Sequence, residues 1–186
     1  MPAKLLQPDV AIDFETRLLR PAQPPAAAWA FFVLPRDMSA RLPTRSQVAV
    51  QGALAEQPFQ VTLEPDGAGG HWMKVEPQLM AQAGVSIGDT VAVSMSVMAQ
   101  QPEPELPADW RAALAEDPAA RTTWDDISAV ARRDWIQWMT SGKKAETRAK
   151  RIATACDMLA TGKRRACCFD RSGIYSGAFS APEAAE

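Results

Sequence analysis

The sequence has few of the side chains on which metal sites and disulfide frameworks depend. It contains one histidine, His71, and three cysteines, Cys156, Cys167 and Cys168, and none of them has the CxxC or HxxxH spacing of a metal site. Three cysteines in 186 residues also make no disulfide framework, so a reducing, cytoplasmic compartment is expected. We therefore predict that the protein holds no metal ion and no cofactor.

Long apolar runs and processing signals are missing as well. No stretch approaches 18 consecutive apolar residues, which predicts that no helix spans a membrane. The N-terminal segment MPAKLLQPDVAIDFE has no continuous apolar core and no small-residue cleavage site, so no signal peptide is expected.

The sequence carries no recognisable catalytic motif. The segment SGKKAET (residues 141–147) contains a Gly-Lys step, but it lacks the glycine spacing, the Ser/Thr and the preceding strand of a phosphate loop. No Gly-x-Ser-x-Gly elbow is present. His71, near Asp66 at the mouth of a predicted hairpin, is the one imidazole available for proton transfer near neutral pH. We assign no catalytic residue and keep a small enzyme centred on His71 as an alternative.

Alternating apolar and polar residues dominate the first half of the chain. Such runs, bounded by Pro, Gly and Asp, predict short β-strands, and a short helix is expected from Pro77 to Ala83, closed by Gly84. Closing short strands into a barrel removes their exposed edges, so residues 1–98 are predicted to form a small β-barrel. The expected strands lie in residues 11–19, 29–35, 47–54, 59–63, 72–75 and 91–97.

Beyond the barrel the period of the apolar residues changes from two to 3.6, which indicates helices. Residues 99–107, AQQPEPELP, are proline-rich and acidic and are typical of a linker. Helices are expected in a module at 108–165: a short one around Trp110 and Leu114, a second from Ser128 to Ser141, and a third from about Lys143 to Thr161. Residues 166–186 are predicted to be an extended or disordered tail, and the fold class is α+β.

The net charge of −2 hides an uneven distribution. Residues 1–119 carry 8 Lys+Arg against 14 Asp+Glu, whereas residues 120–165 carry 11 against 5. Most basic residues of the last predicted helix lie beside its apolar stripe, on the solvent face. The candidate anion contacts are Lys143, Lys144, Arg148 and Arg151.

Two interpretations of this basic helix stay open. It is either a nucleic-acid surface, with Trp124, Trp135 and Trp138 as nearby aromatics, or the solvated face of a helix whose tryptophans are core. The second is favoured because Trp135 and Trp138 fall on the inward face and the overall pI is near 5.5.

Two blocks resemble known families. The block WDDISAVARRDWIQWMTSGKKAETRAKRIATACDMLATGKRR (124–165) resembles the bacteriocin-protection family known as YdeI or OmpD-associated, through its Arg-Arg-acidic step, its Ile/Trp pair, ETRAKRI and the closing GKRR. Residues 29–95 are similar to a domain of unknown function that often precedes that block. One departure is Ser141-Gly142, where the family pattern has an Ala-Lys pair.

The resemblance implies a β-barrel, with the double-split type as one form, followed by a small helical module. It also implies a bacterial cytoplasmic protein linked to bacteriocin or envelope-stress tolerance, and it brings no catalytic residue.

These observations favour a non-enzymatic binding protein. The barrel, or a cleft between barrel and helices, would hold a small ligand or a protein partner, and the basic helix and His71 supply candidate contacts. The alternatives are a nucleic-acid-associated regulatory protein that uses residues 143–165, and the small enzyme centred on His71. The sequence leaves the ligand and the oligomeric state open.

Overall fold

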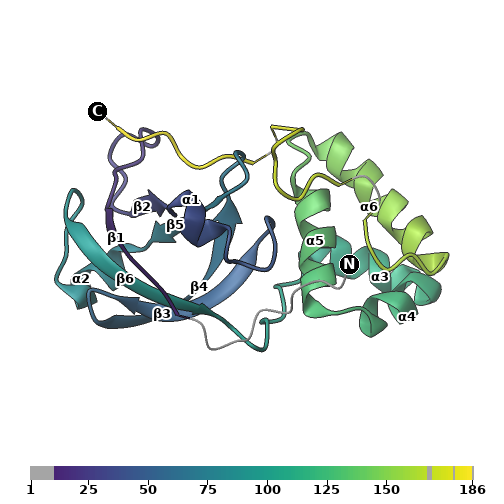
Figure 1. The fold of residues 1–186 in the computed structure, drawn as a ribbon. Helices are drawn as coiled ribbons and strands as arrows, with labels where there is room; N and C mark the ends of the chain where they lie inside the picture. The colour runs from purple at the N-terminus through teal and green to yellow at the C-terminus, as the bar shows by residue number, and fades with distance from the viewer. Residues whose placement is uncertain (1–10, 167–168, 178, 186) are drawn as a thin grey trace. The chain divides into compact units, whose positions relative to one another are not determined.

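The computed structural model describes residues 11–166, 169–177 and 179–185. The chain divides into two compact units. The barrel unit runs to Gln100 and includes the C-terminal segment from Ser172 onward, and the helical unit comprises Gln101–Arg171. The predicted α+β fold, a barrel followed by helices, is confirmed (Figure 1).

The barrel unit is a nearly closed sheet of six antiparallel strands. The strand order is β1-β6-β3-β4-β5-β2, and main-chain hydrogen bonds between Leu19 and Phe31 link the two outer strands. The strands are β1 (Ile12–Arg17), β2 (Ala30–Val33), β3 (Val48–Leu54), β4 (Gln57–Pro65), β5 (His71–Val75) and β6 (Thr90–Val97). Residues on alternate positions of each strand turn inward and bury their apolar side chains in one core.

Two short helices belong to this unit. Helix α2 (Pro77–Ala83) begins with proline at its first turn and ends at Gly84 in a left-handed conformation, as the sequence predicts. Helix α1 (Arg36–Ser39) was not predicted, because four residues are too few to show a helical period.

The helical unit packs four helices around its own apolar core. They are α3 (Ala108–Glu116), α4 (Pro118–Asp126), α5 (Ala129–Thr140) and α6 (Ala145–Ala160). The prediction of three helices was wrong, because α4 is a separate helix. Its start had a local signal: Asp117 accepts a hydrogen bond from the Ala120 amide, and Pro118 occupies the first helical position.

The described part of the C-terminal segment runs along loops of the barrel unit. The Ala22 amide donates to the Glu183 carbonyl (2.7 Å), and the Ala185 amide donates to the Arg20 carbonyl (2.8 Å). The helical unit is therefore an insertion that is connected to the barrel unit by chain at both of its ends. Within the described ranges, no helix has the length and apolar character needed to cross a membrane.

Candidate functional site

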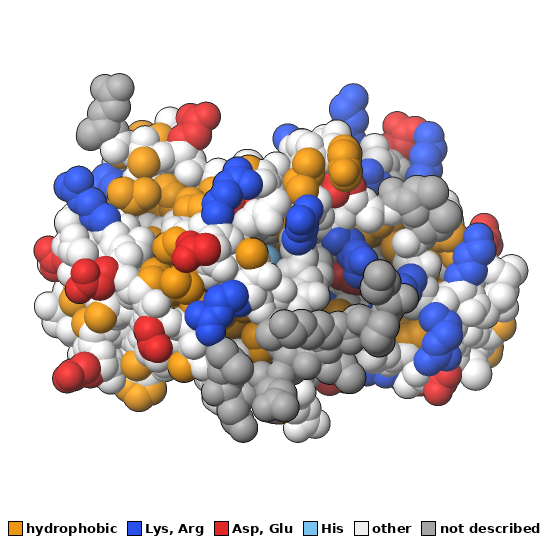
Figure 2. Space-filling model, viewed as in Figure 1, with side chains coloured by type: hydrophobic (Ala, Val, Ile, Leu, Met, Phe, Trp, Pro, Cys, Tyr) orange, Lys and Arg blue, Asp and Glu red, His pale blue; other side chains and the backbone are white. Residues whose placement is uncertain are grey.

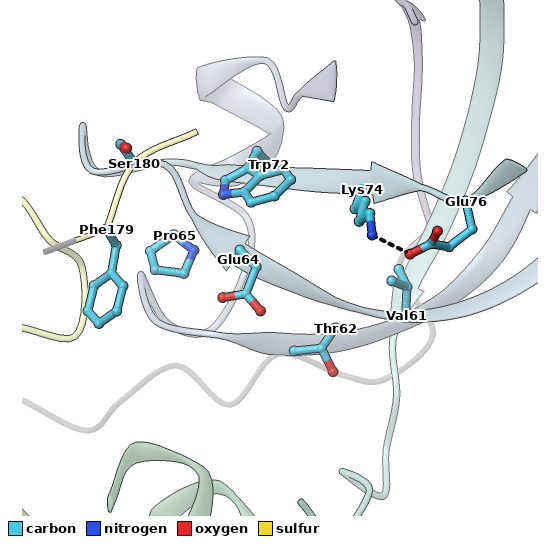
Figure 3. A pocket seen from close by; sticks show the side chains of 9 residues that line it. All are labelled: Val61, Thr62, Glu64, Pro65, Trp72, Lys74, Glu76, Phe179 and Ser180. Atoms are coloured by element: carbon cyan, nitrogen blue, oxygen red, sulfur yellow. Dashed lines mark ion pairs between the residues drawn. The ribbon is translucent and has the colours of Figure 1, made fainter. Parts of the chain in front are cut away.

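A groove of about 600 Å³ opens on the barrel unit between β4 and β5 (Figure 3). The two strands pair at Glu64–Trp72 and Pro65–His71 and then separate. Nine residues line the groove and define it: Val61, Thr62, Glu64, Pro65, Trp72, Lys74, Glu76, Phe179 and Ser180. Its size is in the range of ligand sites in proteins.

The groove opens where β5 stops pairing with β4, after Trp72, although β5 itself continues to Val75. Pro77 starts α2 directly after β5, and α2 packs against β4 and buries Met80 in the barrel core. The far part of β4 is thus covered by a helix and not by a continuing strand. Val61 lies on the same face of β4 as the inward-facing Phe59 and Leu63, but it is only partly buried and also lines the opening.

The charged side chains of the groove are held by specific partners. The Lys74 ammonium lies 2.8 Å from Glu76 Oε1 and 5.0 Å from the centre of the Trp29 ring. The Gln47 side-chain amide donates to both oxygens of Glu64, at 2.8 and 2.9 Å. Two carboxylates against one ammonium give the groove a net negative charge.

His71 is the first residue of β5, next to the groove residue Trp72, but it does not line the groove. Its side chain is fully buried, and its Nε2–H donates to the Ser46 carbonyl (2.9 Å), which can only accept. Nδ1 is therefore the acceptor for the Ser39 hydroxyl at 2.6 Å. Both ring nitrogens are engaged, and neither His71 nor Ser39 lines the groove. This arrangement ties α1 to the barrel and offers no open atom for proton transfer to a substrate.

Burial lowers the pKa of His71 below its ordinary value of 6.5, against the smaller opposing effects of the Ser46 carbonyl and Asp66. The unfolded chain thus binds a proton more readily than the folded chain. We expect the stability of the barrel unit to be unaffected by His71 above pH 7 and to fall as the pH drops below about 6.5, by at most about 1.4 kcal/mol per pH unit. Urea midpoints at pH 7.5 and 5.5 measure this.

His71→Gln is the control for this pH effect, because the chain has one histidine. The variant is less stable at both pH values, but its midpoint changes less between them. Asp109 and Asp126, whose pKa values are lowered by hydrogen bonds from Arg148 and Arg164, titrate below this window. Equal urea midpoints of the wild type at the two pH values would contradict a lowered pKa of His71 in the folded chain.

The four basic candidates of the helical unit separate into two pairs. Lys143 and Lys144 are exposed at the start of α6. Arg148 makes two hydrogen bonds to the Asp109 carboxylate, at 2.6 and 2.8 Å, which raise its own pKa. Arg151 donates to the Trp138 carbonyl and the Ser141 hydroxyl, both at 2.6 Å, and lies over the Trp138 ring. The two arginines therefore join α6 to α3 and to the end of α5.

These contacts predict that substitutions of the four basic candidates change the stability of the helical unit by different amounts. Arg151→Ala is expected to lower the free energy of unfolding of the helical unit by about 1–2 kcal/mol, because it removes two hydrogen bonds and a cation–π contact. Lys144→Ala, the matched control on an exposed lysine, should change it by less than about 0.5 kcal/mol. Urea denaturation followed by circular dichroism at 222 nm compares them. Equal losses in both variants would contradict the structural role of Arg151.

The helical unit as a whole is only mildly basic. It carries 13 Lys+Arg against 11 Asp+Glu, because acidic residues of the linker and α3 fold into the same unit. Trp124 and Trp135 are buried and therefore present no ring face to a base. In Figure 2, the Lys and Arg side chains over the helical unit, on the right, are spread among acidic and neutral side chains.

The cysteines offer no reactive site among the described residues. Burial raises the pKa of the half-buried Cys156 thiol, so the thiol form dominates near neutral pH. Cys167 and Cys168 lie outside the described residues. Within the described ranges, no three His, Cys, Asp or Glu side chains gather in a group that could hold a metal ion.

Sequence reasoning missed the groove. It named His71 as a candidate contact, whereas the groove is lined by the neighbouring Trp72 and Lys74. Outward-facing positions of a hairpin look alike whether the strands stay paired or separate, so no local signal marks the opening. Phe179 comes from the C-terminal segment, more than 100 residues away in the chain.

Comparison with protein families gives two matches that follow the two units. Residues 14–95 match a domain of unknown function (DUF1905), and residues 103–162 match the family described as bacteriocin-protection, YdeI or OmpD-associated. The resemblances found in the sequence are thereby confirmed. A search of curated proteins found no match.

Proposed function

We propose that this protein, in which a DUF1905 barrel precedes a module of the bacteriocin-protection family, is a non-enzymatic binding protein that holds its ligand or partner in the groove between β4 and β5. The observation that carries the proposal is the groove itself. It combines an aromatic ring, aliphatic side chains and a small set of charged groups in one concave surface. The match of the helical unit supports a role linked to bacteriocin tolerance.

The environment of His71 supports binding over catalysis. A general base needs an accessible nitrogen within hydrogen-bond reach of the proton that it removes. His71 is buried and donates and accepts within the barrel wall, so the enzyme alternative has no group in the groove suited to proton transfer near pH 7.

A thermal-shift screen tests the proposal. The protein is screened against metabolites, nucleotides, short DNA and peptides at two salt concentrations, and each hit is repeated on Trp72→Ala. A ligand at 100 times its dissociation constant stabilises by about 2.7 kcal/mol, a shift of several degrees. The proposal requires a hit that Trp72→Ala abolishes.

Trp29→Ala is the matched control. Trp29 and Trp72 both contact the Phe31 ring, with centroids 6.4 and 6.3 Å away, but Trp29 does not line the groove. A hit lost equally in both variants reports damage to the barrel or to the position of Lys74, whose ammonium lies over the Trp29 ring. A hit confined to DNA at low salt and insensitive to Trp72 would assign binding to the basic surface of the helical unit instead.

A further inference from the structure

We infer that the occupant of the groove is an extended peptide segment of another protein, bound as an added strand between β4 and β5, with apolar side chains and a basic side chain facing the groove. This inference rests on the proposed function and names the class of partner. It follows from the directions of the main-chain groups on both sides of the opening.

On the β4 side, the direction is set by the hairpin that joins β3 to β4. Ala55 and Glu56, with φ values of 45° and 71°, form its two-residue turn, so the flanking Leu54 and Gln57 are a hydrogen-bonded pair. Bonded pairs alternate along an antiparallel ladder, so Val61 directs its N–H and C=O to β3. Thr62 therefore directs its main-chain N–H and C=O the other way, into the opening.

On the β5 side, one hydrogen bond and the register with β2 set the direction independently. The Leu34 amide of the β2 side donates to the His71 carbonyl (2.9 Å), so the main-chain N–H and C=O of His71 point towards β2. Because bonded residues alternate along the strand, the main-chain groups of Met73 and Val75 point towards β2 as well. Lys74 alternates with these residues along β5. Its main-chain N–H and C=O therefore point the other way, towards β4.

The hairpin turn agrees with this assignment. The Asp66 amide donates to the Gly70 carbonyl (3.1 Å), and two residues on, Glu64 pairs with Trp72. The next bonded pair would be Thr62 with Lys74, and at this position the strands have separated.

The opening thus has hydrogen-bonding strand edges on two sides, in register with each other. Among the described residues, no strand pairs with Thr62 or Lys74 on these sides. An extended peptide supplies the matching N–H and C=O groups, as in other cases of β-strand addition. A compact metabolite lacks this repeat of donors and acceptors.

The side chains around the opening define the chemistry of the peptide. Val61, Pro65, Trp72 and Phe179 provide apolar surface, and Glu64 and Glu76 outweigh Lys74 in charge. This favours a peptide with an apolar residue and a basic residue on one face of the strand.

The C-terminal segment already docks on the same hairpin through its main chain. The Ala181 amide donates to the Asp66 carbonyl (3.2 Å), and Phe179 and Ser180 line the groove. A Cβ on Gly67 would lie 2.3 Å from the Phe179 carbonyl oxygen, so glycine is needed for this approach. An extended segment therefore fits against the β4–β5 hairpin.

The test uses a displayed library of random 12-residue peptides, selected on the full chain and counter-selected on Trp72→Ala. The binding of the enriched peptides is then measured on Thr62→Pro. This substitution removes a main-chain N–H that faces the opening and leaves the bonds from β4 to β3 in place, as Pro58 already does at an equivalent position of β4. Loss of one hydrogen bond predicts a dissociation constant raised about tenfold.

Two controls separate strand addition from other effects. Thr62→Val changes the same lining side chain but keeps the N–H, so the loss of affinity in Thr62→Pro should exceed the loss in Thr62→Val by about tenfold. N-methylation of the peptide one residue at a time should weaken binding at successive positions within the opening, because the amides of a strand between two edges face β4 and β5 in turn. Circular dichroism confirms that Thr62→Pro is folded, and if it is not, the N-methylation series alone decides.

The outcomes distinguish this inference from the proposed function. If peptides are enriched but show neither the Thr62→Pro loss nor weaker binding on N-methylation, strand addition is overturned and the groove remains a binding site. If no peptide is enriched over Trp72→Ala, the peptide inference is overturned, and the metabolite screen decides the proposed function. A peptide whose binding depends on Trp72, falls in Thr62→Pro and falls on N-methylation supports both the strand addition and the proposed binding function.

Discussion

Gly52→Ala is expected to unfold the barrel unit. Gly52 lies on β3 opposite Met95 of β6. A Cβ there would sit 1.9 Å from the Ser94 carbonyl oxygen and 2.7 Å from the Met95 Cα, both main-chain atoms of a paired strand. Relief requires moving β6, so the expected loss is at least about 4 kcal/mol, a large part of the stability of a small domain.

Hydrogen–deuterium exchange of peptic fragments measures this loss and locates it. Fragments of β3, β4 and β6 should lose protection in Gly52→Ala, while fragments of α3–α6 keep theirs because the helical unit has its own core. The control is Gly84→Ala, where no heavy atom lies within 4 Å of the added Cβ and the cost is that of a φ of 67°, about 1 kcal/mol. Wild-type protection of the barrel strands in Gly52→Ala would contradict the observed register.

Trp110→Ala is expected to cause the corresponding loss in the helical unit. Trp110 is fully buried on α3 and packs edge-on against Trp124 of α4, with ring centroids 5.2 Å apart. Removing a buried tryptophan side chain leaves a large cavity, which costs about 3–5 kcal/mol. Urea denaturation followed by helical circular dichroism should show the helical unit unfolding at a lower midpoint.

Trp110→Phe separates the contribution of ring packing from that of the indole N–H. The Trp110 indole N–H finds no hydrogen-bond acceptor among the described residues, so its loss carries no penalty, and phenylalanine retains part of the packing. Its cost should therefore be less than half that of Trp110→Ala. Equal costs would mean that the indole N–H has a partner, such as a buried water molecule.

These variants also help to interpret the binding experiments. Because each unit has a separate apolar core, a substitution in one core is expected to leave the other unit folded. Trp110→Ala thus asks whether peptide or ligand binding in the β4–β5 groove needs the helical module. If the groove is the whole site, the affinity at temperatures where the barrel is folded is unchanged.

Local patterns were sufficient for most of the secondary structure. Alternation, with one continuous apolar run at 29–35, predicted five or six short strands, and the Pro77 start and Gly84 end predicted α2. Each of these signals depends on residues a few positions apart. The separate helix α4 carried such a signal too, in Asp117-Pro118, which was overlooked. The apolar stripe of α6 likewise predicted its inward face, which includes the buried Ala155 and Leu159.

The sequence by itself predicted the strands, most of the helices, a break near residue 100 and the family that each part resembles, since these follow from short-range periodicity and motif. The tertiary structure alone decided what the polar groups do. His71 is buried against Ser39 from 32 residues away, and Arg148 is held by Asp109 from 39 residues away. The groove likewise depends on where β5 leaves β4 and on a C-terminal segment that returns to the barrel. Such pairings depend on the path of the chain through space, which no local pattern of residues records.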